Sequence, residues 1–404
     1  MTATALGHLR VLDLSRVLAG PWASQNLADL GADVIKIERP GSGDDTRAWG
    51  PPFVRDAAGR ETRTSSYYLS TNRGKRSVTV DLAHPDGQAL IRALARESDV
   101  LLENYKVGTL ARFGLAYEDL RALNPRLIYC SISGFGQDGP CAHLPGYDFI
   151  FQGMGGLMSI TGEPDGAPIK SGLAVVDLFT GMYATTAILA ALERRHLSGV
   201  GQYIDISLFD CIVGISSYQA LNLFLSGKVP QRQGNSHSNL VPYQVFRCSD
   251  ADLIVAMGND SQFRDFCDAL ELPGLADDPR FCTPDGRNRH RAVLLPLIEK
   301  TLRSRSAQHW HARLERAGVP AGPILDLRQT FEHPQVRHRA MKITLPHTGT
   351  ADVPNVANPI RLSESPIRYW HAAPGLGEHT RDVLRHRLGL DDDAIARLRR
   401  SGAI

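Results

Sequence analysis

Asp177 stands at a junction where a carboxylate could have either a structural or a chemical role. An apolar run, Leu173 to Val176, precedes it, and a helical pattern with a three- to four-residue spacing follows as far as Leu192. Free backbone N–H groups and the helix dipole stabilise negative charge at such a junction. The side chain could therefore cap the helix, or it could stay ionised and act as a nucleophile. The local sequence does not decide between these interpretations.

Basic and amide side chains follow several predicted strands in the first half of the chain. These residues are Arg16, Arg39, Lys75, Arg76, Asn104, Lys106 and Arg112. Arg and Lys bind phosphate through charge-assisted hydrogen bonds, so together these residues indicate a phosphate-containing ligand. Each of them taken singly could equally be a solvated surface charge.

One glycine pattern imitates a dinucleotide site. The segment 134–139, GFGQDG, matches G-x-G-x-x-G and follows a predicted strand. Pro140 and Pro145 follow it, however, where the motif requires a helix whose N-terminus holds the pyrophosphate. The first strand-to-helix turn, at 15–21, also lacks the glycine pattern. We therefore do not expect NAD binding.

Strands and helices alternate through the first half of the chain. A strand, a helix opened by Gly20-Pro21 and a second strand form a βαβ unit, which implies a parallel sheet with a ligand site at the strand C-termini. The predicted strands are 9–14, 34–38, 77–82, 99–105, 127–133 and 201–209, and the predicted helices are 20–30, 85–96 and 117–123.

The second half indicates a smaller domain. The segment 226–242 is rich in Gly, Pro and Ser, which marks a domain boundary. A hairpin at 243–258 and helices at 261–270, 287–303 and 307–316 follow. Strands within 344–363 are expected to rejoin the large domain, and 380–401 to be helical. We predict a large domain of residues 1–225 and 330–404, with an α+β domain of residues 226–329 inserted.

Composition sets limits on function. The 404 residues are 43% hydrophobic and 22% charged with a net charge of +2, which gives no sign of a nucleic-acid-binding surface. Six cysteines form no CxxC pair and no metal-ligand cluster with histidine. The N-terminus has no signal-peptide h-region, and no apolar run approaches the ~18 residues of a membrane helix. These features predict a cytoplasmic protein without a membrane partner.

Longer motifs decide the role of Asp177. The segments GFGQDGP (134–140), PGYDFIFQGMGGLMSITGEPDG (145–166) and VVDLFTG (175–181) resemble the signature of class III CoA-transferases, the CaiB/BaiF family. Further matches run in the same order from about residue 9 to about residue 380. In that family, the acid that matches Asp177 attacks an acyl-CoA thioester. The resemblance also implies a Rossmann-like α/β large domain and an interlocked homodimer.

The resemblance implies two sets of binding residues. The first binds coenzyme A and comprises Arg16, Val17, Leu18, Ala19, Arg39, Asn72, Lys75, Asn104, Tyr105 and Arg112. The second binds the acyl or acid substrate and comprises Tyr147, Gly155, Gly156, Asn235 and His237. The two glycines could present amides to an oxyanion or serve only a turn. Formyl-CoA transferase has His and Gln where this chain has Arg16 and Leu18, so its detailed contacts do not transfer.

The implied reaction moves CoA from an acyl-CoA, with succinyl-CoA expected, to a carboxylic acid through an aspartyl anhydride and an aspartyl-CoA thioester. No metal and no permanently bound cofactor is expected. The loop 232–243 is similar to that of glutarate and other dicarboxylate members. Two alternatives stay open, an α-methylacyl-CoA racemase and a non-catalytic acyl-CoA-binding protein. Against the racemase, Tyr147 stands where such enzymes have a catalytic His, and a phenol with a pKa near ~10 is a poor base.

Overall fold

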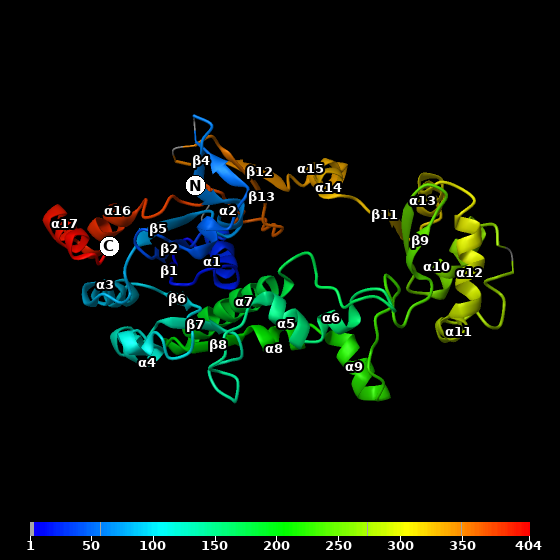
Figure 1. Ribbon diagram of the computed structural model, residues 1–404, viewed down its shortest axis with the longest axis horizontal. Helices are drawn as coiled ribbons and strands as arrows, with labels where there is room; N and C mark the ends of the chain where they lie inside the picture. Colours follow the sequence, from blue (N-terminus) through cyan, green and yellow to red (C-terminus); the bar gives the residue numbers. More distant parts are fainter. Residues whose placement is uncertain (1–3, 57, 273, 349) are drawn as a thin grey trace. The chain divides into compact units, whose positions relative to one another are not determined.

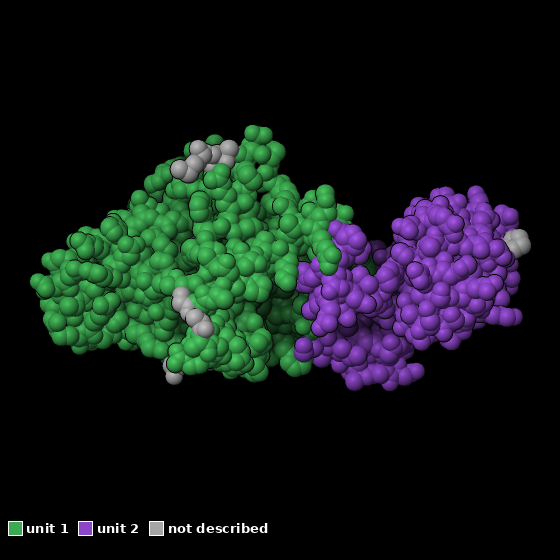
Figure 2. All heavy atoms as spheres, turned by 90° about the horizontal axis from the view of Figure 1, so that it is seen from above, with its two compact units in different colours: residues 1–157, 171–218, 335–404 green, residues 158–170, 219–334 purple. Residues whose placement is uncertain are grey.

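A computed structural model of the chain describes residues 4–56, 58–272, 274–348 and 350–404. It divides into two compact units (Figure 2). Unit 1 comprises residues 1–157, 171–218 and 335–404, and unit 2 comprises residues 158–170 and 219–334. The predicted domain boundaries fall near these divisions, but the segment 158–170 groups with unit 2 rather than with the large domain.

A six-stranded sheet forms the centre of unit 1 (Figure 1). Its strand order is β5-β2-β1-β6-β7-β8, and all five pairings are parallel, as the alternation of strands and helices predicted. The unit is therefore α/β. The strands are β1 (Arg10–Asp13), β2 (Asp33–Glu38), β5 (Lys75–Thr79), β6 (Val100–Glu103), β7 (Ile128–Ser133) and β8 (Tyr203–Ser207).

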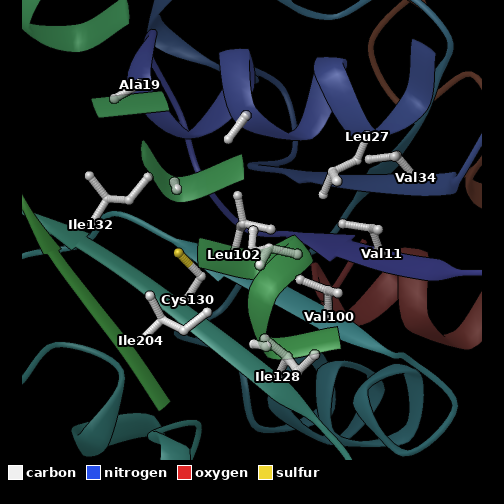
Figure 3. Close-up of a cluster of buried hydrophobic side chains, with 14 of the residues drawn as sticks. Val11, Ala19, Leu27, Val34, Val100, Leu102, Ile128, Cys130, Ile132 and Ile204 are labelled. Atoms are coloured by element: carbon white, nitrogen blue, oxygen red, sulfur yellow. The ribbon is translucent and has the colours of Figure 1, made fainter. Parts of the chain in front are cut away.

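One face of the sheet packs against α1 (Ala19–Asp29), α7 (Val175–Ser198) and α8 (Leu208–Gly214). Figure 3 shows part of this core, in which Leu27 of α1 lies beside Val34 and Val11 of the strands. Apolar area removed from water stabilises a fold by about 25 cal/mol per Å². This layer therefore holds α1 and α7 on one face of the sheet.

The other face of the sheet packs against helices from both ends of the chain. A second buried cluster joins Leu12, Ile35 and Leu101 of the strands to these helices. The helices are α3 (Pro85–Arg96), α4 (Tyr117–Leu123), α16 (Thr380–Leu388) and α17 (Asp392–Ser401). Helices thus cover both faces, which explains why the strands read as continuous apolar runs.

The helix α7 corrects one expectation from the sequence. It has 24 residues and a mean hydropathy of 1.6 over an 18-residue window, so its length and composition would suffice to cross a membrane. No apolar run of this length was expected from the sequence. Within unit 1, however, α7 buries Val176, Ala184 and Ile188 against the sheet and α1, as a core helix does.

Smaller elements complete unit 1. The segment 344–363 belongs to unit 1, as expected, and its strands β12 (Lys342–Leu345) and β13 (Val353–Val356) pair with each other in a separate two-stranded sheet. A second hairpin, β3 with β4, precedes α2. The bounds are η1 (Asp45–Ala48), β3 (Phe53–Arg55), β4 (Glu61–Ser65), α2 (Ser66–Thr71), η2 (Ala111–Phe113) and α5 (Asp148–Met154).

Unit 2 contains a three-stranded antiparallel sheet, β11-β10-β9, with a core of its own. The predicted hairpin is confirmed as β9 (Tyr243–Arg247) and β10 (Asp252–Ala256), and β11 (Ala321–Pro323) adds the third strand. The single helix expected at 287–303 is two helices, because the chain breaks at His290. The helices that lie in or reach into this unit are α6 (Leu157–Ile160), α9 (Ser217–Ser226), α10 (Asp260–Ala269), α11 (Pro284–Arg289), α12 (Arg291–Leu302), α13 (Ala307–Arg316), α14 (Leu327–Glu332) and α15 (Pro334–His338).

Candidate active site

Asp177 lies in the first turn of α7 and does not cap it. The N-cap residue is Ala174, whose side chain makes no capping hydrogen bond. The Asp148 carboxylate caps the helix instead, because its Oδ1 accepts from the backbone N–H groups of Val176 (2.8 Å) and Asp177 (3.2 Å). No described residue donates a hydrogen bond to the Asp177 carboxylate itself. The capping interpretation of Asp177 is therefore wrong, and its carboxylate is available for chemistry.

Asp177 faces a cavity of about 150 Å³ within unit 1. The cavity lies beyond the carboxyl ends of β1, β6 and β7, where a parallel sheet is expected to bind ligands. Nine residues predicted from the sequence meet in its lining, namely Arg16, Val17, Leu18, Ala19, Asn104, Tyr105, Lys106, Tyr147 and Asp177. Asp45 and His143 are among the further residues that line it.

Gly181 lets α7 approach the N-terminus of α1 closely. A Cβ atom at this position would lie 2.7 Å from the carbonyl oxygen of Ala19 and 2.9 Å from Cδ1 of Trp22. Real Cβ atoms essentially never approach so near, so any larger residue would push the helices apart. Gly181 is one helical turn beyond Asp177, and it therefore sets how near the carboxylate lies to the start of α1.

The turn that precedes α1 is fastened by side chains. Asn104 Oδ1 accepts from the Arg16 N–H (2.9 Å), and its Nδ2 donates to the Arg16 carbonyl (2.7 Å). Asp44 accepts from the Val17 N–H at 3.2 Å. Asn104 therefore holds the turn, and its amide is already engaged. The Arg16 guanidinium reaches the exposed Asp45 carboxylate at 2.8 Å.

The electrostatics around Asp177 are unusual for an aspartate. Burial and the nearby Asp148 carboxylate raise the pKa of Asp177 to about 7. Burial and the carboxylates of Asp177 and Asp148 also raise the pKa of Tyr67 to about 12, so this phenol stays protonated. The Tyr67 ring packs edge-on against Trp49. The Asp177 carboxyl group is thus a weaker acid than an ordinary aspartate.

Comparison with known proteins identifies the family of the chain that carries this carboxylate. The family model described as CoA-transferase family III matches residues 6–380. The chain belongs to CoA-transferase family III. It is therefore a transferase enzyme that uses CoA thioesters as substrates.

Relatives of this CoA-transferase cover almost its whole length. A succinate–glutarate CoA-transferase of Agrobacterium fabrum is 49% identical over 379 residues, which are 94% of each chain. A succinyl-CoA:glutarate CoA-transferase of Homo sapiens is 41% identical over 401 residues, which are 99% of this chain and 90% of the relative. The crystal structure of a CaiB/BaiF family protein from Brucella suis matches with a TM-score of 0.81 and 46% identity over 94% of this chain and 98% of that chain.

Some of the predicted coenzyme-binding residues of the CoA-transferase do not line the cavity of Asp177. Lys75 and Asn72 are fully buried, and the Lys75 ammonium donates to Asp13 (3.1 Å), to the Pro21 carbonyl (3.0 Å) and to Asn72 (2.9 Å). Burial lowers the pKa of Lys75 to about 8. These contacts make Lys75 and Asn72 part of the interior rather than phosphate ligands. Arg39 and Arg112 are exposed, but neither lines the cavity.

The two predicted substrate-binding glycines use their amides within the chain. The Gly155 N–H donates to the Phe151 carbonyl at 2.8 Å, and the Gly156 N–H donates to the Gly153 carbonyl at 3.2 Å. Both therefore serve the turn after α5, and an oxyanion would need other donors. A Cβ at Gly155 would lie 2.3 Å from Ile212, so this residue also permits close packing.

The remaining predicted substrate residues belong to unit 2 of the CoA-transferase. Asn235 is exposed. The His237 Nδ1 accepts from the backbone N–H groups of Asn239 (3.0 Å) and Leu240 (3.1 Å), and its ring lies 5.1 Å from that of Tyr243. This nitrogen therefore orders the loop, and a substrate contact of either residue stays a prediction.

The sequence did not predict a role for Asp148 or Tyr67. Asp148 belongs to the PGYD motif quoted above, so its position was visible but its capping role was not. Tyr67 had no signal in the sequence. Within the described ranges, no three His, Cys, Asp or Glu side chains are grouped so that they could hold a metal ion.

Proposed function

We propose that this CoA-transferase moves CoA from succinyl-CoA to a dicarboxylic acid such as glutarate, with Asp177 as the nucleophile. The observation that carries the proposal is the unpaired Asp177 carboxylate at a cavity lined by predicted coenzyme-binding residues. The choice of substrates rests on the printed names of relatives that are 41–49% identical and on the loop 232–243.

The reaction exchanges one thioester for another, so it needs no ATP. The Asp177 carboxylate attacks the thioester carbonyl, which forms a mixed anhydride and releases CoA thiolate. The thiolate then attacks the aspartyl carbonyl, which forms an aspartyl-CoA thioester and releases the donor acid. The acceptor carboxylate attacks this thioester and gives a second anhydride and thiolate. Attack of the thiolate on the acyl carbonyl forms the new acyl-CoA and restores Asp177.

Negative charge develops on carbonyl oxygens beside Asp177 in each step. The N-terminus of α1 offers donors for it, because Leu18 caps the helix without a side-chain hydrogen bond. Within the described chain, the N–H groups of Leu18 and Ala19 have no hydrogen-bond acceptor. Both residues line the same cavity as Asp177. We propose that these two N–H groups donate hydrogen bonds to the oxyanion. From the sequence, Gly155 and Gly156 were the candidates for this role.

The coenzyme is held by cationic and apolar groups around this cavity. Arg16 and Lys106 stand in its wall, where their charges would attract the phosphates of CoA. Tyr105 provides an aromatic surface beside them. The exposed Arg39 and Arg112 follow β2 and β6, and a long ligand such as CoA could extend to them.

The enzyme is proposed to be an interlocked homodimer in the cytoplasm, with the smaller α+β domain inserted in the chain of the larger. Support for a partner subunit comes from apolar side chains that unit 1 leaves exposed. They lie on α5, α7 and α8 and comprise Phe149, Ile150, Met154, Phe179, Met182, Tyr183, Leu189 and Val213. Large exposed apolar side chains on several helices of one unit are typical of a covered interface. Analytical ultracentrifugation should give twice the monomer mass.

Mass spectrometry tests the nucleophile directly. Wild-type enzyme incubated with succinyl-CoA should carry one additional CoA mass on the peptide that contains Asp177. Asp177→Ala should lose this adduct and all turnover but keep its fold, because Asp148 still caps α7. Turnover by the alanine variant at the wild-type rate, or an adduct on another peptide, would refute the mechanism.

A further inference from the structure

Val17 has a backbone conformation that its side chain disfavours. Its φ angle is 71°, in the left-handed region, which β-branched residues adopt only when the surrounding structure forces them. Conformations of this kind cluster at functional sites, where the surroundings maintain the strain. Val17 lies directly before the two unpaired N–H groups and lines the cavity of Asp177.

Three side chains from separate elements hold this turn. Lys36 of β2 donates from its ammonium to the Ser15 carbonyl at 2.9 Å. Asn104, directly after β6, bonds both the N–H and the carbonyl of Arg16. Asp44, the N-cap of η1, accepts from the Val17 N–H at 3.2 and 3.3 Å. Consecutive backbone groups from Ser15 to Val17 are thus occupied.

The Asp44 carboxylate is itself fixed by a buried ion pair. Lys36 Nζ lies 2.9 Å from Asp44 Oδ2, and both side chains are almost completely buried. Burial opposes the charge on each group. The Lys36 ammonium nevertheless keeps the pKa of Asp44 below its usual value, and Asp44 and Asp13 keep the pKa of Lys36 above its own. The pair therefore stays charged across the working pH range.

The side-chain hydrogen bonds to this turn end at Val17, directly before the unpaired N–H groups of Leu18 and Ala19. Side chains occupy the N–H groups of Arg16 and Val17, whereas no described residue accepts from those of Leu18 and Ala19. A left-handed residue reverses the direction of the chain, so the conformation of Val17 determines where these next two N–H groups point.

We propose that Asp44, held in place by Lys36, is a positioning residue of the transferase, which keeps Val17 left-handed and so directs the Leu18 and Ala19 N–H groups toward the charge that forms at Asp177. The inference rests on the proposed function. Asp44 touches no substrate in this role, and it acts through the backbone of the turn.

A purely structural ion pair would behave differently, and the chain offers a matched example. Asp29 and Arg73 form a buried pair at 2.6 Å in the same unit, and neither residue lines the cavity. Asp29→Asn therefore removes the same charge from a comparable pair without touching the turn. Both oxygens of Asp44 accept hydrogen bonds, Oδ1 from the Thr46 N–H and Oδ2 from Lys36, so an Asn amide must turn a donor toward one of them. We therefore expect Asp44→Asn to lower kcat about 100-fold, the loss typical of one oxyanion donor, with KM changed less than threefold. Asp29→Asn should lower kcat less than threefold per folded molecule.

A double-mutant cycle separates the effect on Val17 from a general loss of stability. Val17→Gly and Val17→Ala both remove the valine side chain, but only glycine adopts the left-handed conformation without strain. The penalty of Asp44→Asn on kcat should be at least tenfold smaller in the Val17→Gly background than in the Val17→Ala background. Equal penalties in the two backgrounds would overturn the proposal.

A second variant covers the case in which Asp44→Asn does not fold. Asn104→Ala releases the same turn from a partly exposed strand end, and it should lower kcat at least tenfold. Wild-type kcat in this variant would also overturn the proposal. Failure of the proposed function has a different signature, namely wild-type enzyme whose turnover does not depend on Asp177. Turnover that depends on Asp177 but is unchanged by Asp44→Asn refutes only the positioning role.

Discussion

The carboxylate of Asp148 caps the helix whose first turn carries Asp177. It accepts hydrogen bonds from the N–H groups of Val176 and Asp177, so one acid fixes the position of the other. The same carboxylate helps to raise the pKa of Asp177 to about 7. Position and acidity of the proposed nucleophile are therefore coupled through one side chain.

Removal of the Asp148 charge should shift the pH profile of the reaction. In the wild type, kcat/KM should fall about tenfold per pH unit below about 7, because only ionised Asp177 attacks the thioester. Asp148→Asn keeps an oxygen acceptor for α7 but removes the negative charge, so this acid limb should move to lower pH. Asp138→Asn, in an exposed loop, serves as the control. An unchanged limb in Asp148→Asn would show that Asp148 does not set the pKa.

The raised pKa of Asp177 should also reduce the stability of the folded enzyme. Between about pH 4 and about 7 the unfolded chain ionises Asp177 while the folded chain keeps it protonated, so stability falls as pH rises. Above about pH 7 the full penalty is present. Asp177→Asn should therefore raise Tm, and by more at pH 8 than at pH 5. Thermal denaturation at both values checks this, and an equal gain at the two pH values would contradict it.

Tyr67 should contribute through its hydroxyl group without affecting the pH profile. Its pKa of about 12 keeps it protonated throughout the assay range, so any contribution of the hydroxyl should not vary with pH. Tyr67→Phe keeps the edge contact with Trp49 and should lower kcat/KM about tenfold, near the loss of one hydrogen bond to a charged group. Steady-state kinetics from pH 6 to 9 measure both effects. Wild-type kcat/KM would exclude a role for the hydroxyl.

The proposed substrate class predicts a strong preference for dicarboxylic acids. A site built to hold a distal carboxylate leaves polar groups unpaired when a monocarboxylate binds. With succinyl-CoA as donor, kcat/KM for adipate should greatly exceed kcat/KM for hexanoate, which has the same chain length. Equal values for the two acids would rule out recognition of the distal carboxylate.

Exchange of the α-proton separates the transferase from a racemase. Racemisation requires two acid–base groups that flank the α-carbon. Tyr147 is 63% exposed and stands where racemases place a His, while His143 lies in the cavity wall. We expect no deuterium at the α-carbon of 2-methylacyl-CoA in D₂O under conditions of fast acyl exchange. Rapid incorporation that depends on Asp177 would instead support the racemase, and His143→Gln would test the second base.

Local patterns in the sequence were sufficient for much of the fold. Hydrophobic runs and helix boundary signals act over a few residues, which is why β1, α1 and α3 could be predicted. The break at His290 was not predicted, because helix propensity does not reveal the end of one helix immediately before another. The long motifs that resemble the family identified Asp177 and the turn at 16–19, because such motifs can be matched residue by residue along the sequence.

Only the tertiary structure decided what these residues do. Lys75 and Asn104 look like phosphate ligands in the sequence, yet one is buried beside Asp13 and the other is bonded to the backbone of Arg16. Asp148, 29 positions before Asp177, became its helix cap only when α5 packed next to α7. Burial and hydrogen-bond partners depend on which distant segments meet, and the sequence by itself determines such contacts only through the complete fold.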